Sequence, residues 1–371
     1  MNFSDTIFTS SEKVTYSLRS LYEENGYSRY KMSKFEEYGL YAKNKDFLIS
    51  DSIITFTDIG GRLMALKPDV TLSIVKNGKD EKGSVQKVYY NENVYRVNKG
   101  SDAFKEIMQV GVECIGDIDT YCINEVLLLA AQSLKSISED FVLDVSHLGI
   151  LSSVIKKAGL EGSSRKIVKC ISEKNLHELI SLCKEENVDE ENLSLLTKLV
   201  TLSGSHKTVL PLLSEAFENN DEIKQLEDIC AVFTEAGLEN NLRIDFSVVS
   251  DINYYNGIVF KGYIDGVYDA VLSGGQYDNL LRKMSRTSSA IGFAVYLDSL
   301  NFSLNSASSL DAEALLLYDS KVDFVSLRKA ANELKKTYRR VLVSKAKNEN
   351  GRYGKIFKMT ENGVTEVEED A

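Results

Sequence analysis

The feature that most constrains this fold is a switch in hydrophobic periodicity, because strand-like segments lie on both sides of a long helical block. Short β-rich segments occur between Lys31 and Gly116, and similar segments return from Ile244 onward. The intervening residues, about 148 to 240, place apolar side chains at helical spacing, for example along Leu176–Cys183. The pattern therefore predicts a strand-rich core that carries a helical insertion.

The same periodicity predicts the individual elements of the core. Strands are expected at Ile53–Thr57, Lys87–Tyr90, Met108–Val112, Phe141–Val145, Ile244–Val249, Ile258–Tyr263 and Val267–Leu272. Helices are expected at about 9–25, at about 124–137 and at about 292–300. A further helix is expected to start within the segment 66–71 and to continue through Val75. The pair Gly274-Gly275 is interpreted as a turn that leads into a further helix.

A segment rich in Ser and Asn, Ser303–Ser309, predicts a linker between the core and a smaller unit. After it, a strand at Ala314–Tyr318, a helix at about 322–337 and a strand at Arg340–Ser344 follow one another. The expected division is residues 1–302 for the core and 310–371 for a small α/β domain. The predicted fold class is α+β, with an antiparallel sheet flanked by helices.

Composition argues against several classes of function. The chain has 371 residues, and 44 Lys+Arg against 55 Asp+Glu give a net charge of −11, which disfavours a nucleic-acid partner. No apolar run approaches the roughly 20 residues of a membrane-spanning helix, and the first residues lack the features of a secretion signal. Five scattered cysteines without a CxxC pair indicate neither a disulfide framework nor a metal site. A cytoplasmic protein without metal or cofactor is therefore expected.

Three stretches of sequence carry most of the information about function. The first is Leu66–Thr71, the second joins Val94–Arg96 to Phe104–Gly116, and the third combines Asn253–Phe260, Ser273–Asp278 and Ala290–Ala294. Their order and spacing resemble the catalytic core of histidyl-tRNA synthetases, over about residues 9 to 300. This resemblance implies the class II aminoacyl-tRNA synthetase fold.

The resemblance is incomplete at the positions that handle ATP phosphates. Ser250 and Ser299 stand where the synthetase motifs have arginines, and Gln276 replaces the arginine of a Gly-Gly-Arg-Tyr-Asp segment. Asn98 replaces a glutamate, and Arg96 is the phosphate-handling arginine that remains. Serine cannot supply the fixed cationic fork of arginine, and the loss of one preorganised donor commonly costs roughly 10²–10³ in rate. The resemblance therefore implies that amino-acid activation is lost.

The amino-acid pocket implied by the resemblance is retained. Carboxylate and amide oxygens suit an α-ammonium group, while a tyrosine and Glu113 suit the two imidazole nitrogens of histidine. Gln109 and Glu113 are four residues apart, so on a strand they point to the same face. The histidine-binding residues that the resemblance implies are Asp69, Thr71, Arg96, Gln109, Glu113, Tyr254, Tyr255 and Tyr277.

A retained pocket combined with lost chemistry resembles the regulatory subunit of ATP phosphoribosyltransferase, a synthetase paralogue of histidine biosynthesis. That family implies a non-catalytic subunit that is required for the first step of the pathway. It implies a short-form catalytic phosphoribosyltransferase as partner, feedback inhibition by L-histidine, and a homodimer within a hetero-oligomer. The C-terminal unit agrees, because it does not resemble the anticodon-binding domain of a synthetase.

Each motif taken alone also has a purely structural interpretation. Asp69 can cap the helix that follows it, and Gln109 with Glu113 can form an exposed polar edge of the sheet. The pair Tyr254-Tyr255 can be core aromatics. Arg96 can belong to a surface ion pair.

Two other functions also remain open at this point. The first is a diverged histidine-activating enzyme whose missing arginines are replaced by Lys261, Arg282 or Arg286. The second is an RNA-binding sensor, which the acidic composition disfavours.

Overall fold

The computed structural model describes residues 8–48, 52–78, 83–97, 103–217, 220–249, 254–298, 300 and 310–367. The chain divides into two compact units between Leu304 and Asn305. Each unit has a hydrophobic core of its own, and the linker predicted at 303–309 lies outside the described residues.

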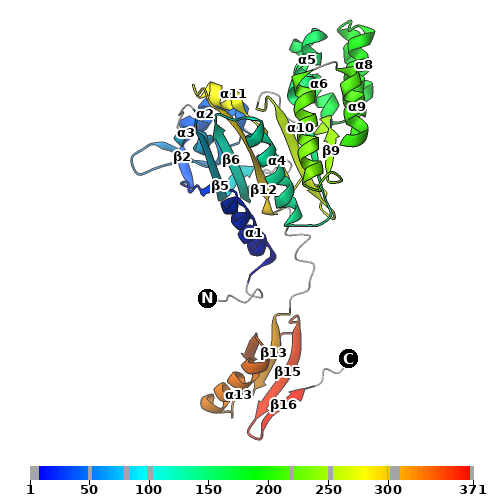
Figure 1. Ribbon diagram of the computed structural model, residues 1–371. Helices are drawn as coiled ribbons and strands as arrows, with labels where there is room; N and C mark the ends of the chain where they lie inside the picture. The colour runs from blue at the N-terminus through cyan, green and yellow to red at the C-terminus, as the bar shows by residue number, and fades with distance from the viewer. Residues whose placement is uncertain are drawn as a thin grey trace. The chain divides into compact units, whose positions relative to one another are not determined.

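The first unit is built around a sheet whose strands follow the spatial order β1-β5-β6-β12-β11-β10-β7-β9-β8 (Figure 1). These strands are β1 Ser28–Arg29, β5 Val85–Val97, β6 Phe104–Gly116, β7 Phe141–His147, β8 Ser203–Ser205, β9 Leu242–Asp245, β10 Ile258–Ile264, β11 Leu272–Gln276 and β12 Ser289–Tyr296. The neighbours from β5 across to β7 are all antiparallel, whereas β1 pairs with β5 and β7 pairs with β9 in parallel. The predicted α+β class with an antiparallel core is confirmed.

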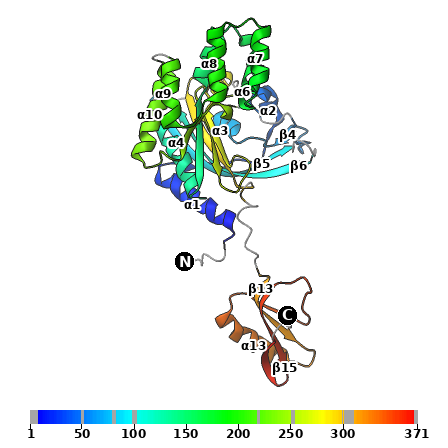
Figure 2. The same cartoon turned by 90° about the vertical axis from the view of Figure 1, so that its right-hand side faces the viewer.

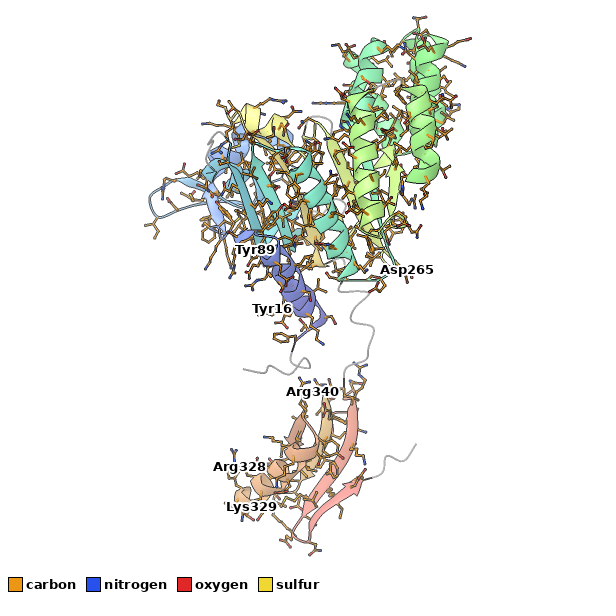
Figure 3. All side chains as sticks on the ribbon, viewed as in Figure 1. Tyr16, Tyr89, Asp265, Arg328, Lys329 and Arg340 are labelled. Carbon is orange, nitrogen blue, oxygen red and sulfur yellow. The ribbon has the colours of Figure 1, made fainter. Side chains whose placement is uncertain are left out.

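Helices pack on both faces of this sheet. The helices of the first unit outside the insertion include α1 Ser10–Glu24, α2 Tyr38–Lys43, α3 Thr71–Asn77, α4 Thr120–Lys135 and α11 Asp278–Lys283. Alternation along β6 directs Val110 and Val112 into the core cluster that contains the buried residues of α1 and α4. Tyr89 of β5 packs there against Tyr22 of α1, with ring centroids 6.1 Å apart; Figure 3 labels Tyr89 beside that helix. The opposite face of the sheet is left for a second cluster.

The second face of the sheet carries a smaller hydrophobic cluster and a small sheet. Tyr90 and Val94 of β5 pack in this cluster with residues of α3 and α11. The small sheet has the order β2-β4-β3, with β2 Phe35–Glu37, β3 Thr55–Thr57 and β4 Leu63–Leu66. This arrangement brings the start of α3 over the central strands.

The predicted helical insertion is present between β7 and β9. Its helices are α5 Leu148–Lys157, α6 Ser164–Ser172, α7 Leu176–Glu185, α8 Glu190–Thr201, α9 His206–Ala216 and α10 Asp221–Glu235. Figures 1 and 2 show them gathered at one end of the sheet. The short strand β8 lies within the insertion and extends the sheet by pairing with β9, which the periodicity did not predict.

Three predictions for the end of the core are wrong at least in part. The helix predicted at about 292–300 has its first residues inside strand β12, although Leu297, Asp298 and Leu300 are helical. Gly274-Gly275 lies within strand β11 instead of forming a turn, and the strand predicted at Val267–Leu272 begins at Leu272. Phe293 and Val295 of β12 belong to the core cluster on the face of the sheet that carries α1 and α4, and β12 itself lies between β6 and β11. A strand buried on both faces has a continuous apolar run, which periodicity cannot separate from a buried helix.

The second unit is a four-stranded sheet with one packed helix. Its strands follow the order β14-β13-β15-β16, with β13 Ala312–Tyr318, β14 Val341–Ser344, β15 Tyr353–Thr360 and β16 Gly363–Val367, and its helix is α13 Phe324–Thr337. Leu316, Leu327, Phe357 and Met359 belong to its core. The strands and the helix predicted for this unit are confirmed.

None of the helices in the described ranges is long and apolar enough to cross a membrane.

Candidate functional site: a cavity on the central sheet

A cavity of about 150 Å³ lies on the central sheet, and β5, β6, β10, β11 and β12 all contribute to its lining. Every residue that the sequence assigned to the histidine pocket lines this cavity: Asp69, Thr71, Arg96, Gln109, Glu113, Tyr254, Tyr255 and Tyr277. The three sequence motifs therefore meet at one place, although they lie far apart along the chain.

Glu113 is the centre of the polar contacts in this cavity. Its side chain is buried, and its carboxylate accepts hydrogen bonds from the Thr71 hydroxyl at 2.7 Å and from the Tyr277 hydroxyl. Burial raises the pKa of Glu113 to about 8; the two hydroxyl donors oppose this shift, and the nearby charge of Asp69 adds to it. At neutral pH Glu113 is therefore largely protonated, and a bound cation would favour its charged form.

Asp69 has two roles at the start of α3. Its Oδ1 accepts a hydrogen bond from the backbone N–H of Leu72 at 2.8 Å, so the helix-capping interpretation is confirmed, and Asp69 lines the cavity as well. Burial raises the pKa of Asp69, while the Arg96 charge acts in the opposite direction. The Arg96 Nε donates to the Pro68 carbonyl oxygen at 2.8 Å, so Arg96 supports the loop that carries Asp69.

Three tyrosines form an aromatic wall. The ring centroid of Tyr254 lies 4.6 Å from that of Tyr255 and 6.0 Å from that of Tyr277. Burial raises the pKa of Tyr254 and of Tyr277 well above the usual value, so both hydroxyls stay protonated. These rings pack in the second hydrophobic cluster, so they are core aromatics, and they also line the cavity.

Glycines on neighbouring strands make room for these side chains. Gly292 of β12 is the register partner of Glu113 on β6, and a Cβ atom on Gly292 would overlap Glu113 Oε2. Gly275 of β11 pairs with Gly292, and a Cβ atom there would lie 2.7 Å from the Tyr255 ring. The glycine that the sequence analysis placed in a turn therefore admits a site residue instead.

Sequence reasoning missed several lining residues. Ser273 and Tyr296 line the cavity, and Lys261 had been considered only as a substitute for a missing arginine. Alternation places Lys261 and Val259 on one face of β10, a signal that was available from the sequence. Tyr296 could not be predicted from strand alternation, because its segment had been predicted as a helix.

Of the four positions at which the chain departs from the phosphate-handling motifs of the synthetases, the structure describes Gln276. The Gln276 amide oxygen accepts a hydrogen bond from the Ile258 N–H at 2.8 Å, and Gln276 does not belong to the cavity lining. Ser250, Ser299 and Asn98 lie outside the described residues.

Of the cations considered as replacements, only Lys261 lines the cavity among the residues that the structure describes. The Arg282 side chain is 65% exposed and lies 4.0 Å from Asp278, and Arg286 donates to the Gly78 carbonyl oxygen. Within the described ranges, no group of three or more His, Cys, Asp or Glu side chains is arranged to hold a metal ion.

Comparison with known proteins agrees with this geometry. A family model described as histidyl-tRNA synthetase matches residues 6–300. The ATP phosphoribosyltransferase regulatory subunit of Clostridium kluyveri is 30% identical over 332 residues, which cover 86% of this chain and 85% of the relative. The corresponding regulatory subunit of Bacillus cereus is 27% identical over 297 residues, covering 78% and 71%.

Solved structures show the same fold at lower identity. An ATP phosphoribosyltransferase regulatory subunit/histidyl-tRNA synthetase from Bacillus halodurans aligns with a TM-score of 0.72 and 23% identity, covering 90% of this chain and 88% of that one. A chain of the ATP phosphoribosyl transferase (HisG:HisZ) complex from Thermotoga maritima aligns with a TM-score of 0.62 and 20% identity, covering 77% and 97%.

The central sheet and its cavity thus define a class II aminoacyl-tRNA synthetase-like core. More narrowly, the chain belongs to the histidyl-tRNA synthetase family, and within it to the ATP phosphoribosyltransferase regulatory subunits.

Proposed function

We propose that this chain is the non-catalytic regulatory subunit of an ATP phosphoribosyltransferase, required for the first step of histidine biosynthesis. The similarity to the regulatory subunits of Clostridium kluyveri and Bacillus cereus supports this role over most of the chain. The phosphoribosyl transfer itself is then carried out by a short-form catalytic partner. Two copies of this chain form a homodimer, and this homodimer assembles with the partner into a hetero-oligomer.

The second part of the proposal is that L-histidine binds in the cavity and inhibits the assembly. The observation that carries it is the convergence of the eight motif residues on one cavity. Asp69 and Glu113 provide carboxyl groups for the ammonium and imidazole of the ligand, and the same lining also contains cationic side chains. A zwitterionic amino acid, which carries one positive and one negative group, therefore complements the charges of the lining.

Inhibition requires histidine to favour one state of the assembly over another. A ligand shifts an equilibrium only through its differential affinity for the two states, and such coupling commonly amounts to about 1–3 kcal/mol. When the concentration of histidine falls, histidine dissociates from the cavity and the assembly returns to its active state.

Reconstitution with the cognate catalytic subunit tests both parts. The rate of phosphoribosyl-ATP formation should rise with added chain until it saturates, and L-histidine should then lower it. Glu113→Ala should still activate but lose the inhibition by histidine, because it removes the central carboxyl of the cavity. Glu139→Ala, at an exposed position, is the matched control and should behave as the unaltered chain. Failure to activate under any condition would contradict the regulatory role.

The rival activity has its own assay. A diverged histidine-activating enzyme would exchange ATP with pyrophosphate when histidine is present. We expect no exchange, because Lys261 alone does not replace a set of arginines around the phosphates. Robust exchange would overturn the non-catalytic assignment.

A further inference from the structure

Lys261 is a cation of the cavity that the proposed histidine pocket has not used. It lies on β10 as the register partner of Ser273 on β11, and Ser273 pairs in turn with Ala294 on β12. Directly paired residues share a face of the sheet, so Lys261 stands in the same row as two other lining residues. Its place is three strands away from Glu113 on β6.

The described residues around Lys261 leave its charge uncompensated. Among the residues that the structure describes, no carboxylate forms an ion pair with its ammonium group, and burial alone lowers the pKa of Lys261. The closest acidic register partner, Asp144 on β7, instead lies 3.3 Å from the Nε of Arg243. A partly desolvated ammonium without a counter-charge is costly, and a bound anion would offset that cost.

The other cation of the cavity is already engaged. Arg96 donates to the Pro68 carbonyl oxygen and stands close enough to Asp69 to oppose the rise in its pKa. Its charge therefore belongs to the acidic end of the cavity. Lys261 defines the opposite, positive end.

A pair of hydroxyl groups lies beside Lys261. The Ser273 Oγ and the Tyr296 hydroxyl are 2.7 Å apart and share one hydrogen bond. Two hydroxyl groups carry two hydrogens and only one is used between them, so the other can be donated to a ligand oxygen. Tyr296 is the register partner of Gln109, which connects this pair to the other end of the pocket.

We propose that Lys261, together with the Ser273–Tyr296 hydroxyl pair, binds the α-carboxylate of the amino acid and thereby makes the cavity selective for a free carboxylate. This inference rests on the proposed function, because it concerns the same ligand. Neighbouring strands lie about 4.8 Å apart, so β10 and β6 are separated by roughly 14 Å. The long lysine side chain bridges part of this span, and the amino acid fills the rest, with its ammonium and imidazole toward Asp69 and Glu113.

Calorimetric titration of the full chain with L-histidine and with L-histidinol, in which a hydroxymethyl group replaces the carboxylate, tests this assignment. The unaltered chain should prefer histidine by at least tenfold. Lys261→Met should weaken histidine binding by at least tenfold and leave the affinity for histidinol unchanged, so that the preference disappears. Lys261→Arg should retain most of the preference for histidine over histidinol. Lys135→Met is the control: Lys135 lies on α4, on the other side of the sheet, and its substitution should change neither affinity.

The outcomes separate this inference from the function on which it rests. A preference for histidine that persists in Lys261→Met, or an equal loss of both ligands, would overturn the role of Lys261 while the histidine site stands. Absence of histidine binding to the unaltered chain would overturn both. The thermal midpoint of unliganded Lys261→Met should equal or exceed that of the unaltered chain, because an uncompensated charge is removed; a marked decrease would indicate a structural role instead.

Discussion

At the scale of single residues, the cavity is organised around the carboxyl group of Glu113, whose pKa burial raises. Glu113 is enclosed by Thr71, Tyr277 and the backbone of Gly292, and Asp69 lies close enough to influence its charge. Burial is the main reason why the unliganded site favours a neutral Glu113, and repulsion from the charge of Asp69 adds to it. A cationic ligand removes that restraint, which couples binding to the protonation of the site.

This protonation predicts a specific pH dependence of stability. With a folded pKa of about 8 and an ordinary value near 4.5, Glu113 holds a proton in the folded state that the unfolded chain releases between these values. Its contribution to the free energy of unfolding is therefore fully present below about pH 4.5 and is lost as the pH rises to about 8. Relative to Glu113→Gln, the unaltered chain should lose stability across this window.

Urea denaturation of both proteins at several pH values measures the difference. Asp69 and other shifted groups are common to both and cancel in the comparison. The exposed substitution Glu139→Gln provides the control and should leave the profile unchanged. Parallel profiles for Glu113→Gln and the unaltered chain would show that Glu113 ionises normally.

At the scale of elements, the site depends on the close packing of β6, β12 and β11. Gly275, Gly292 and Glu113 form one row across these strands, and the two glycines give the carboxyl and the Tyr255 ring the space that side chains would fill. The sequence predicted the residues of the pocket because they lie in recognisable motifs. It did not predict this row, because β12 has an unbroken apolar run and paired glycines usually indicate turns.

Gly292→Ala should therefore damage both the sheet and the site. The added Cβ would meet Glu113 Oε2 and the backbone oxygen of Val112, which cannot both move away. We expect a loss of about 1–3 kcal/mol in the free energy of unfolding, as is usual for overpacking, and at least a tenfold loss of histidine affinity. Gly162→Ala, where no atom lies within 4 Å of the added Cβ, is the control. A Gly292→Ala protein with normal stability and binding would contradict the packing described for these strands.

At the scale of the whole molecule, the chain consists of two units with separate cores. Every residue that lines the cavity belongs to the first unit, whereas Leu316, Leu327 and Phe357 hold the second one together. The alternation of strand and helix was enough to predict the second unit, because its elements are short and clearly bounded. Its role does not follow from any motif in the sequence.

This division predicts that the first unit binds histidine by itself. A fragment of residues 1–304 should fold cooperatively and bind L-histidine with the affinity of the full chain, because it retains the complete lining. Circular dichroism melting and calorimetric titration of the fragment check both expectations. A well-folded fragment with more than a tenfold loss of affinity would mean that the second unit contributes to the site.

The central claim is that this cavity senses histidine without activating it. The most direct test is calorimetric titration of the purified chain with L-histidine in the absence of ATP, alongside Glu113→Ala. Binding in the micromolar range that is lost in the variant is the predicted result, because Glu113 connects Thr71 and Tyr277 at the centre of the lining. No binding by the unaltered chain, or equal binding by the variant, would contradict the claim.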